Sequence, residues 1–160
     1  MKFIQKGADL DFQDQEDGCT PLHWASQNSH EGCVTLLLDH GASMEIQNKN
    51  GNTPLHWACF KGNEGCATLL LGHGANMEIQ NKDGDTPLHW ACYYGHERCA
   101  TILLDHGANV EIQNKDGDTP LQYAKSENHT NIVQLLENFE NSQQLNQEEG
   151  EKVNEEEERK

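Results

Sequence analysis

The chain has 160 residues, of which 34% are hydrophobic, and it carries 27 acidic residues against 11 basic ones, for a formal net charge of −16. Nucleic-acid binding depends on clusters of lysine and arginine that neutralise phosphates, so this charge balance argues against a nucleic-acid partner. The same balance disfavours an anionic membrane surface, and no apolar run approaches the roughly 20 residues that span a bilayer.

Residues 1–14 are predicted to be a partial unit of the repeat that fills most of the chain. Gly7-Ala8 matches the pair with which later units end their second helix, whereas only Phe3 and Ile4 remain from that helix. A stack of repeats needs a polar outer cap. We therefore expect an incomplete first repeat that continues upstream in the natural protein. The alternatives are a short local fold or a covering chain, including weak self-association of an otherwise monomeric protein at this edge.

Residues 15–141 contain four units of one 33-residue repeat. The sequence Thr-Pro-Leu-His opens at Thr20, Thr53 and Thr86, and it returns as Thr-Pro-Leu-Gln at Thr119. A period of this length indicates one supersecondary unit stacked on copies of itself. The predicted unit boundaries are 15–47, 48–80, 81–113 and 114–141.

Each unit is predicted to contain a turn followed by two helices. An Asn-Gly or Asp-Gly pair favours a tight turn. In the second full unit, Thr53 then stands where a helix N-cap belongs, directly before a proline at the first helical position. The first helix is expected to end near Gly62, and the second to start around Glu64. Gly74 suits the left-handed position that ends the second helix.

Residues 142–160 differ in character from the repeats. They have almost no apolar content and carry a block of like charge from Glu155 through Glu158. Such a composition predicts a disordered acidic tail. Extension of the last helix by a turn or two is the alternative, because Gln and Glu favour helices.

The repeat resembles that of the ankyrin family, whose pattern is close to D-x-x-G-x-T-P-L-H-x-A, followed by G-H, paired leucines and G-A. The best match comprises Asp83–Ala91, Gly95-His96, Leu103-Leu104 and Gly107-Ala108. The resemblance covers roughly residues 7–141. It implies an all-α ankyrin-repeat solenoid in which every repeat contributes a β-turn and two antiparallel helices.

The motif histidines are predicted to be structural. The resemblance implies that His23, His56 and His89 form hydrogen bonds that fix the turn and link adjacent repeats. Zinc needs four ligands converging within about 2.0–2.3 Å. Repeat-equivalent side chains lie about one helix spacing apart, roughly 8–10 Å. No metal site and no cofactor are therefore expected.

The six cysteines are predicted to be reduced. Most occupy equivalent repeat positions, such as Cys66 and Cys99, which are too far apart for the Cα separation below about 7 Å that a disulfide needs. Thiols buried between repeats are inert, and no other group suggests a catalytic residue, so we expect no enzyme. Reduced cysteines and an N-terminus that turns polar too soon for a signal peptide predict a cytoplasmic protein, with the nucleus left open.

The resemblance implies that a partner protein contacts the turn tips and the exposed face of the first helices, which together line a concave groove. Phe60, Tyr93 and Tyr94 stand out there, because aromatic residues are enriched at interfaces. The alternative is that these rings merely cover the next repeat, and the three tryptophans are expected to pack within or between repeats. The predicted partner-binding residues are Phe60, Lys61, Tyr93, Tyr94, Asp83, Asp85, Asp116, Asp118, Lys49 and Asn52.

Together these features predict a non-enzymatic protein-interaction module. The acidic tips would suit a partner that carries a basic surface. The resemblance also permits a regulatory alternative, in which the chain is an inhibitor that occludes a kinase or transcription-factor surface. No residue in the sequence discriminates between these two roles.

Overall fold

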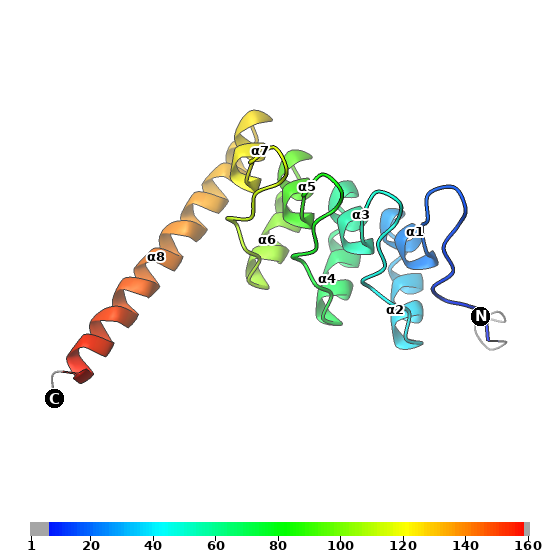
Figure 1. Cartoon of the computed structure of the whole chain (residues 1–160), viewed down its shortest axis with the longest axis horizontal. Coiled ribbons are helices and arrows are strands. Elements are labelled where there is room, and N and C mark those ends of the chain that lie inside the picture. Colours follow the sequence, from blue (N-terminus) through cyan, green and yellow to red (C-terminus); the bar gives the residue numbers. More distant parts are fainter. Residues whose placement is uncertain (1–6, 159–160) are drawn as a thin grey trace.

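The computed structural model describes the backbone of residues 7–158 and the side chains of residues 7–145. This part of the chain contains no β-strand and folds into four helix pairs (Figure 1). The pairs are α1 (Pro21–Gln27) with α2 (Glu31–Asp39), α3 (Pro54–Lys61) with α4 (Glu64–Gly72), α5 (Pro87–Tyr93) with α6 (Glu97–Asp105), and α7 (Pro120–Ser126) with α8 (Thr130–Glu158). The expected all-α solenoid is confirmed. Phe3 and Ile4 of the expected partial repeat lie outside the described residues.

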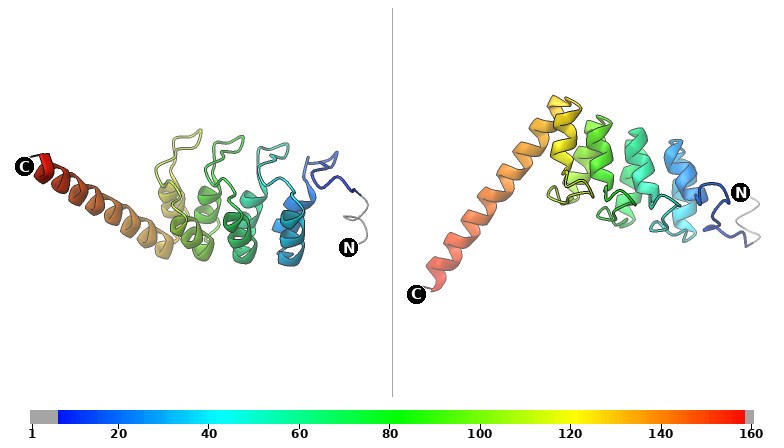
Figure 2. Two further views of the ribbon diagram at one scale, coloured as in Figure 1. Left: turned by 90° about the horizontal axis from the view of Figure 1, so that it is seen from below. Right: turned by 45° about the horizontal axis from the view of Figure 1, so that its top comes forward.

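Successive pairs stack along one axis and form two layers. The first helices α1, α3, α5 and α7 pack on one another in order, and the second helices α2, α4, α6 and the start of α8 form the other layer (Figure 2). The loop before each first helix projects from the stack. We call these loops fingers 1 to 4; they span residues 7–20, 41–53, 74–86 and 107–119.

The threonine of each motif caps its first helix, as the sequence predicts. In the second unit the His56 backbone N–H donates to Thr53 Oγ1 at 3.4 Å, and the Thr53 N–H donates to His56 Nδ1 at 3.1 Å. The fourth unit forms the same reciprocal pair with glutamine, because the Thr119 N–H donates to Gln122 Oε1 at 2.6 Å. A proline occupies the first turn of all four first helices.

The motif histidines also connect neighbouring units, which confirms their predicted structural role. The Nε2 atoms of His23, His56 and His89 lie 2.9, 3.0 and 3.0 Å from backbone carbonyl oxygens of the following finger. Since Nδ1 accepts from the motif threonine, Nε2 carries the proton and donates to the carbonyl. Each ring is therefore held in the neutral form by two sets of bonds.

This arrangement predicts that acid weakens the fold. Burial lowers the pKa of His56 to about 4, and burial also lowers the pKa values of His23 and His89. In the unfolded chain a histidine binds its proton near pH 6.5. The unfolded state is therefore favoured as pH falls from about 6.5 toward 4, and His56 alone is expected to cost about 2 kcal/mol of stability at pH 5.

The measurement is the thermal midpoint, followed by circular dichroism at pH 7, 6 and 5, where most carboxylates are still ionised. A midpoint that stays constant over this interval would show that the rings do not remain neutral in the folded protein. A His56→Gln variant supplies the matched control, and its pH dependence should be shallower.

The core lies between the two layers and is made of leucines, alanines and cysteines. Leu55, Leu88 and Leu103 are buried, as are Cys59, Cys66, Cys92 and Cys99. All six cysteines are free thiols, and burial raises the pKa of Cys66 to about 11. Cys33, at the position of Cys66, is exposed because no described helix pair packs on that side of α2.

Helix α8 is much longer than its counterparts. Glycines Gly41, Gly74 and Gly107 follow α2, α4 and α6 with φ values of 85°, 89° and 86°, which suit a helix end. The equivalent position in the last unit is Glu140, so nothing in the sequence ends the helix there. Within the described residues 142–158 the backbone is helical and not disordered, as in the alternative of an extended last helix, because α8 leaves the stack and continues to Glu158 (Figure 1). Glutamine and glutamate favour this extension. Residues 159 and 160 of the predicted tail lie outside the described residues.

Among the described residues, no helix combines the length and the apolar character needed to cross a membrane.

Candidate protein-binding surface

An aromatic ridge runs along the first helices α3, α5 and α7. It comprises Trp57, Phe60, Trp90, Tyr93, Tyr94 and Tyr123. The Phe60 ring lies at the centre, with centroids 4.6 Å from Tyr94 and 5.4 Å from Trp90 in edge-to-face geometry. Tyr93 continues the ridge toward Tyr123 at 5.3 Å. Edge-to-face pairs of this kind contribute stability beyond their buried area.

The ridge combines packed rings with rings that face solvent. Phe60 is half-buried against the next unit, whereas Tyr93 and Tyr94 remain 40% and 44% exposed. Phe60 therefore covers its neighbour, as one of the two sequence interpretations expects. Both tyrosines still present a large apolar surface to solvent. Lys61 is exposed beside them, with Nζ 4.7 Å from the Phe60 ring centroid.

Two histidines fix the backbone of the ridge, although the sequence analysis named His96 only as part of the repeat pattern and did not name His129. The Nε2 atoms of His96 and His129 lie 3.0 Å from the carbonyl oxygens of Phe60 and Tyr93, respectively. These bonds connect each second helix to the first helix of the preceding unit. The sequence did contain a signal for this contact, namely a histidine 34 residues after a glycine. The glycine is needed because a Cβ at Gly62 would lie 2.5 Å from the His96 ring.

The phenol groups of Tyr94 and Tyr123 stay protonated at neutral pH. Burial raises the pKa of Tyr94, with a further contribution from the neighbouring Tyr93 and Asp85. Burial likewise raises the pKa of Tyr123 to about 12, and its hydroxyl oxygen accepts a bond from Asn114 Nδ2 at 2.7 Å. The exposed Tyr94 hydroxyl is therefore a neutral hydrogen-bonding group.

Two predicted site residues are part of the scaffold. Asn52 and Asp85 are buried between fingers, where their side-chain oxygens accept from Asn81 Nδ2 and Asn114 Nδ2, each at 3.0 Å. The next finger covers each of them, so their side chains do not reach the surface. Lys49 is exposed, but its Nζ is bonded to backbone carbonyls of finger 1.

The remaining acidic residues of the prediction do line the tips. Asp83 and Asp116 are exposed, and Asp118 is half-buried. They belong to fingers 3 and 4, next to the first helices α5 and α7 that carry Tyr93 and Tyr123. The acidic tips and the tyrosines therefore belong to the same two units of the stack.

A separate apolar hollow lies at the other end of the stack. Pro21, Trp24, Cys33 and Leu36 line a space of about 500 Å³ on the outer side of the first unit. Trp24 is 44% exposed, although its Nε1 donates to Asp14 Oδ2 at 3.1 Å. Trp24 is therefore less completely packed between repeats than the sequence predicts, whereas Trp57 and Trp90 are half-buried. No group of His, Cys, Asp or Glu suited to a metal ion occurs in the described residues.

A solenoid of short helix pairs with projecting loops defines a class of repeat proteins with extended recognition surfaces. A family model described as ankyrin repeats in three copies matches residues 1–81 and 64–148 of the chain. The chain belongs to the ankyrin repeat family. The family supports binding of another protein as the function of the fold.

Individual relatives match over short segments. The chain is 46% identical to human 2-5A-dependent ribonuclease over 50 residues, which cover 31% of this chain and 7% of that protein. It is 50% identical to the human inhibitor of Bruton tyrosine kinase over 46 residues, which cover 29% of this chain and 3% of that protein. It is 39% identical to mouse ankyrin repeat domain-containing protein 40 over 46 residues, which cover 29% of this chain and 13% of that protein. The matches thus span only a small part of these relatives.

Proposed function

We propose that the chain is a non-enzymatic binding module whose partner protein docks on the aromatic ridge and on the tips of fingers 3 and 4. The observation that carries this proposal is the exposure of Tyr93 and Tyr94 on a rigid, hydrogen-bonded backbone. Packing against the next unit leaves 40% and 44% of these two tyrosines uncovered, and such rings are frequent anchors at interfaces. Their backbone is already fixed, so little conformational entropy is lost on binding.

The partner is expected to present an apolar patch bordered by basic side chains. Asp83, Asp116 and Asp118 supply the negative rim, and the net charge of −16 attracts a positively charged surface over a longer range. Rim charges mainly govern the association rate and selectivity. The tyrosines would contribute most of the affinity.

A regulatory role is the second candidate. The relative named inhibitor of Bruton tyrosine kinase shares 50% identity over 46 residues with this chain. A chain that covers a kinase or transcription-factor surface would use the same ridge, so geometry alone does not separate an inhibitor from an adaptor. An activity assay on the purified partner, with and without the chain, separates the two roles.

The proposal predicts that a Tyr93→Ala/Tyr94→Ala variant loses its partner while keeping its fold. Tyr93 and Tyr94 are 40% and 44% exposed and lie at the surface of the ridge, so the helical circular-dichroism spectrum should be kept. The thermal midpoint should fall only modestly, because the edge-to-face contacts of these rings with Phe60 and Tyr123 are lost. Loss of an aromatic anchor costs about 2 kcal/mol or more of binding free energy, or roughly 30-fold in affinity. Affinity capture from native lysate with quantitative mass spectrometry measures the effect.

Phe12→Ala is the matched control, because Phe12 is 60% exposed but lies on finger 1, outside the ridge. Proteins retained by the native chain and by this control, yet lost with the tyrosine variant, are the partners of the ridge. Equal retention of every captured protein by all three baits would refute the proposed surface.

A further inference from the structure

Neighbouring fingers are joined by hydrogen bonds that repeat with the 33-residue period. In each junction the side-chain amide of a glutamine donates to a backbone carbonyl of the next finger. The three bonds are Gln13 to Gln47, Gln47 to Gln80 and Gln80 to Gln113, at 3.1, 3.1 and 3.0 Å. The fingers therefore form one continuous ladder along the solenoid.

Two further bonds per junction run in the opposite direction. The backbone N–H of Lys49, Lys82 and Lys115 donates to a carbonyl of the preceding tip at 2.9–3.0 Å. Near the base, the N–H groups of Ser43, Asn76 and Asn109 donate to carboxylates of the preceding finger at 2.8, 2.9 and 2.9 Å. Each finger thus offers three groups to the finger that follows it: a carboxylate, a glutamine side-chain amide and a backbone carbonyl at its tip.

Finger 4 offers these groups to no other finger. The equivalent groups are the Glu111 carboxylate, the Gln113 side-chain amide and the Asp116 carbonyl, and none is bonded to another finger within the described part of the chain. The glycines give an independent sign of the open edge. A Cβ at Gly84 would lie 2.7 Å from the Lys115 nitrogen, whereas one at Gly117, with nearly the same φ, meets nothing within 4 Å.

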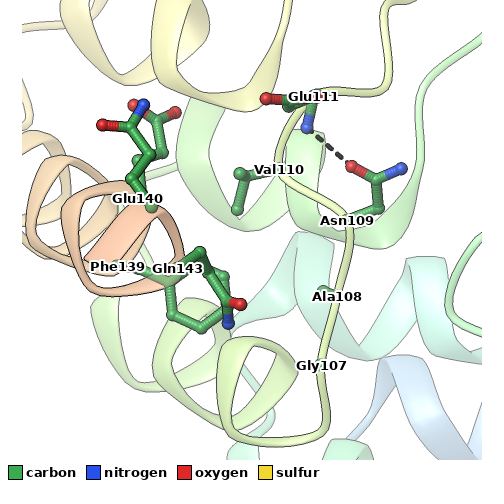
Figure 3. Close-up of a pocket in the computed structure, with 9 residues that line it drawn as sticks. Gly107, Ala108, Asn109, Val110, Glu111, Phe139, Glu140 and Gln143 are labelled. Carbon is green, nitrogen blue, oxygen red and sulfur yellow. Dashed lines mark hydrogen bonds between the residues drawn. The ribbon is translucent and has the colours of Figure 1, made fainter. Parts of the chain in front are cut away.

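The base of this edge is a crevice against α8. It has a volume of about 480 Å³ and lies between residues 107–111 and the α8 residues Phe139, Glu140, Gln143 and Gln144 (Figure 3). It exists because α8 continues as a helix where earlier units turn into the next finger. Val110 and Phe139 supply apolar surface, and the volume is within the roughly 300–1,000 Å³ range of ligand sites.

We propose that this edge binds an extended, basic segment of a partner protein, which adds to the ladder as a fifth finger. The spacing follows from the existing junctions, in which Asn109, Gln113 and Lys115 supply an N–H, a carbonyl and a second N–H. The incoming segment therefore needs a backbone N–H for the Glu111 carboxylate and, four residues later, a backbone carbonyl for the Gln113 amide. Two residues after that it needs a second N–H for the Asp116 carbonyl. Main-chain bonds to an open edge are an established mode of peptide recognition.

Charge determines the type of segment. The edge and crevice carry the carboxylates of Glu111, Asp116, Asp118 and Glu140, against the single ammonium of Lys115. A second copy of the chain would bring Asp14, Glu16 and Asp17 of its own finger 1 to these carboxylates. Like charges across an interface are unfavourable. A lysine-containing segment of another protein fits, whereas head-to-tail stacking of this chain does not.

The test uses a synthetic peptide with the sequence Asn-Val-Lys-Ile-Gln-Asn-Lys, acetylated, amidated and labelled with fluorescein. It follows residues 109–115, with lysine in place of glutamate. Binding to the full chain is measured by fluorescence anisotropy at low ionic strength. We expect saturable binding that weakens about tenfold or more when the nitrogen of the seventh residue is methylated, because methylation removes the donor to Asp116.

The matching variants of the chain are Gly117→Ala and Gly41→Ala. Both glycines have nearly equal positive φ and open space around them, but only Gly117 lies on the edge. A Cβ there would collide with the incoming segment as it would at Gly84, so Gly117→Ala should abolish binding and Gly41→Ala should not. The proposal is overturned if the peptide does not bind at about 1 mM, or if the methylated peptide binds equally well. It is also overturned if Gly117→Ala binds the peptide as the native chain does. Finally, it is overturned if the chain self-associates as its concentration rises and thereby displaces the peptide, because a second copy would then occupy the edge.

Discussion

Exchange of His56 for alanine is expected to lower the free energy of unfolding by about 4 kcal/mol. The ring is fully buried, accepts from the Thr53 N–H at Nδ1 and donates from Nε2 to the Asp85 carbonyl. Its removal leaves a buried donor and a buried acceptor without partners, at a cost of about 1–3 kcal/mol each. The lost edge-to-face contact with Trp90, whose centroid lies 5.6 Å away, adds to the effect.

A His56→Gln variant divides this effect into two parts. Gln122 closes the same cap in the fourth unit, so glutamine at position 56 should keep the bonds to Thr53. Glutamine does not reproduce the ring geometry by which His56 Nε2 donates to the Asp85 backbone carbonyl. Urea unfolding should therefore show about half of the alanine effect. If both variants lose the same free energy of unfolding, the bonds to Thr53 contribute nothing to stability. If the glutamine variant is as stable as the native chain, the bond to the Asp85 carbonyl contributes nothing.

The sequence was sufficient for the parts of the fold that follow local rules. A threonine before a proline specifies a cap and a helix start within four residues, and a fixed period specifies that the resulting units stack. These rules predicted all four first helices. They depend on neighbours in the chain and not on tertiary contacts, which explains why they were reliable here.

Burial within the fingers could not be predicted in the same way. Asn52 and Asp85 are polar residues of exposed-looking loops, and both were expected to contact a partner. Their burial depends on Asn81 and Asn114, which lie 29 residues further along and reach them only after stacking. A polar residue in a loop is assigned to the surface unless the covering element is already known.

The long helix α8 shows a signal that was present but not used. A composition of glutamate and glutamine predicts disorder when no stabilising contact is known. The decisive feature is Glu140, which stands where the earlier units carry a helix-ending glycine. Comparison of equivalent positions explains why the helix does not end with the stack, and the glutamine and glutamate residues that follow then favour its continuation.

The ladder of fingers leads to a second large effect, at Gly84. Gly84→Ala is expected to destabilise the fold by about 3–4 kcal/mol, whereas Gly117→Ala should cost only about 1–2 kcal/mol. Both residues have nearly identical positive φ values of 85° and 86°, so the intrinsic backbone strain is the same. The difference arises because a Cβ at Gly84 would also lie 2.7 Å from the Lys115 nitrogen and 3.0 Å from the Asn114 backbone.

Relief of that collision requires finger 4 to move away from finger 3. Such a movement stretches the bond from the Lys115 N–H to the Asp83 carbonyl and the buried bond from Asn114 to Asp85. Urea titrations of both variants, followed at the same helical signal, measure the difference in unfolding free energy. If the two variants are equally stable, the fingers separate without cost. In that case an added segment at finger 4 would gain nothing from the same bonds, so this comparison also tests the energy available to a fifth finger.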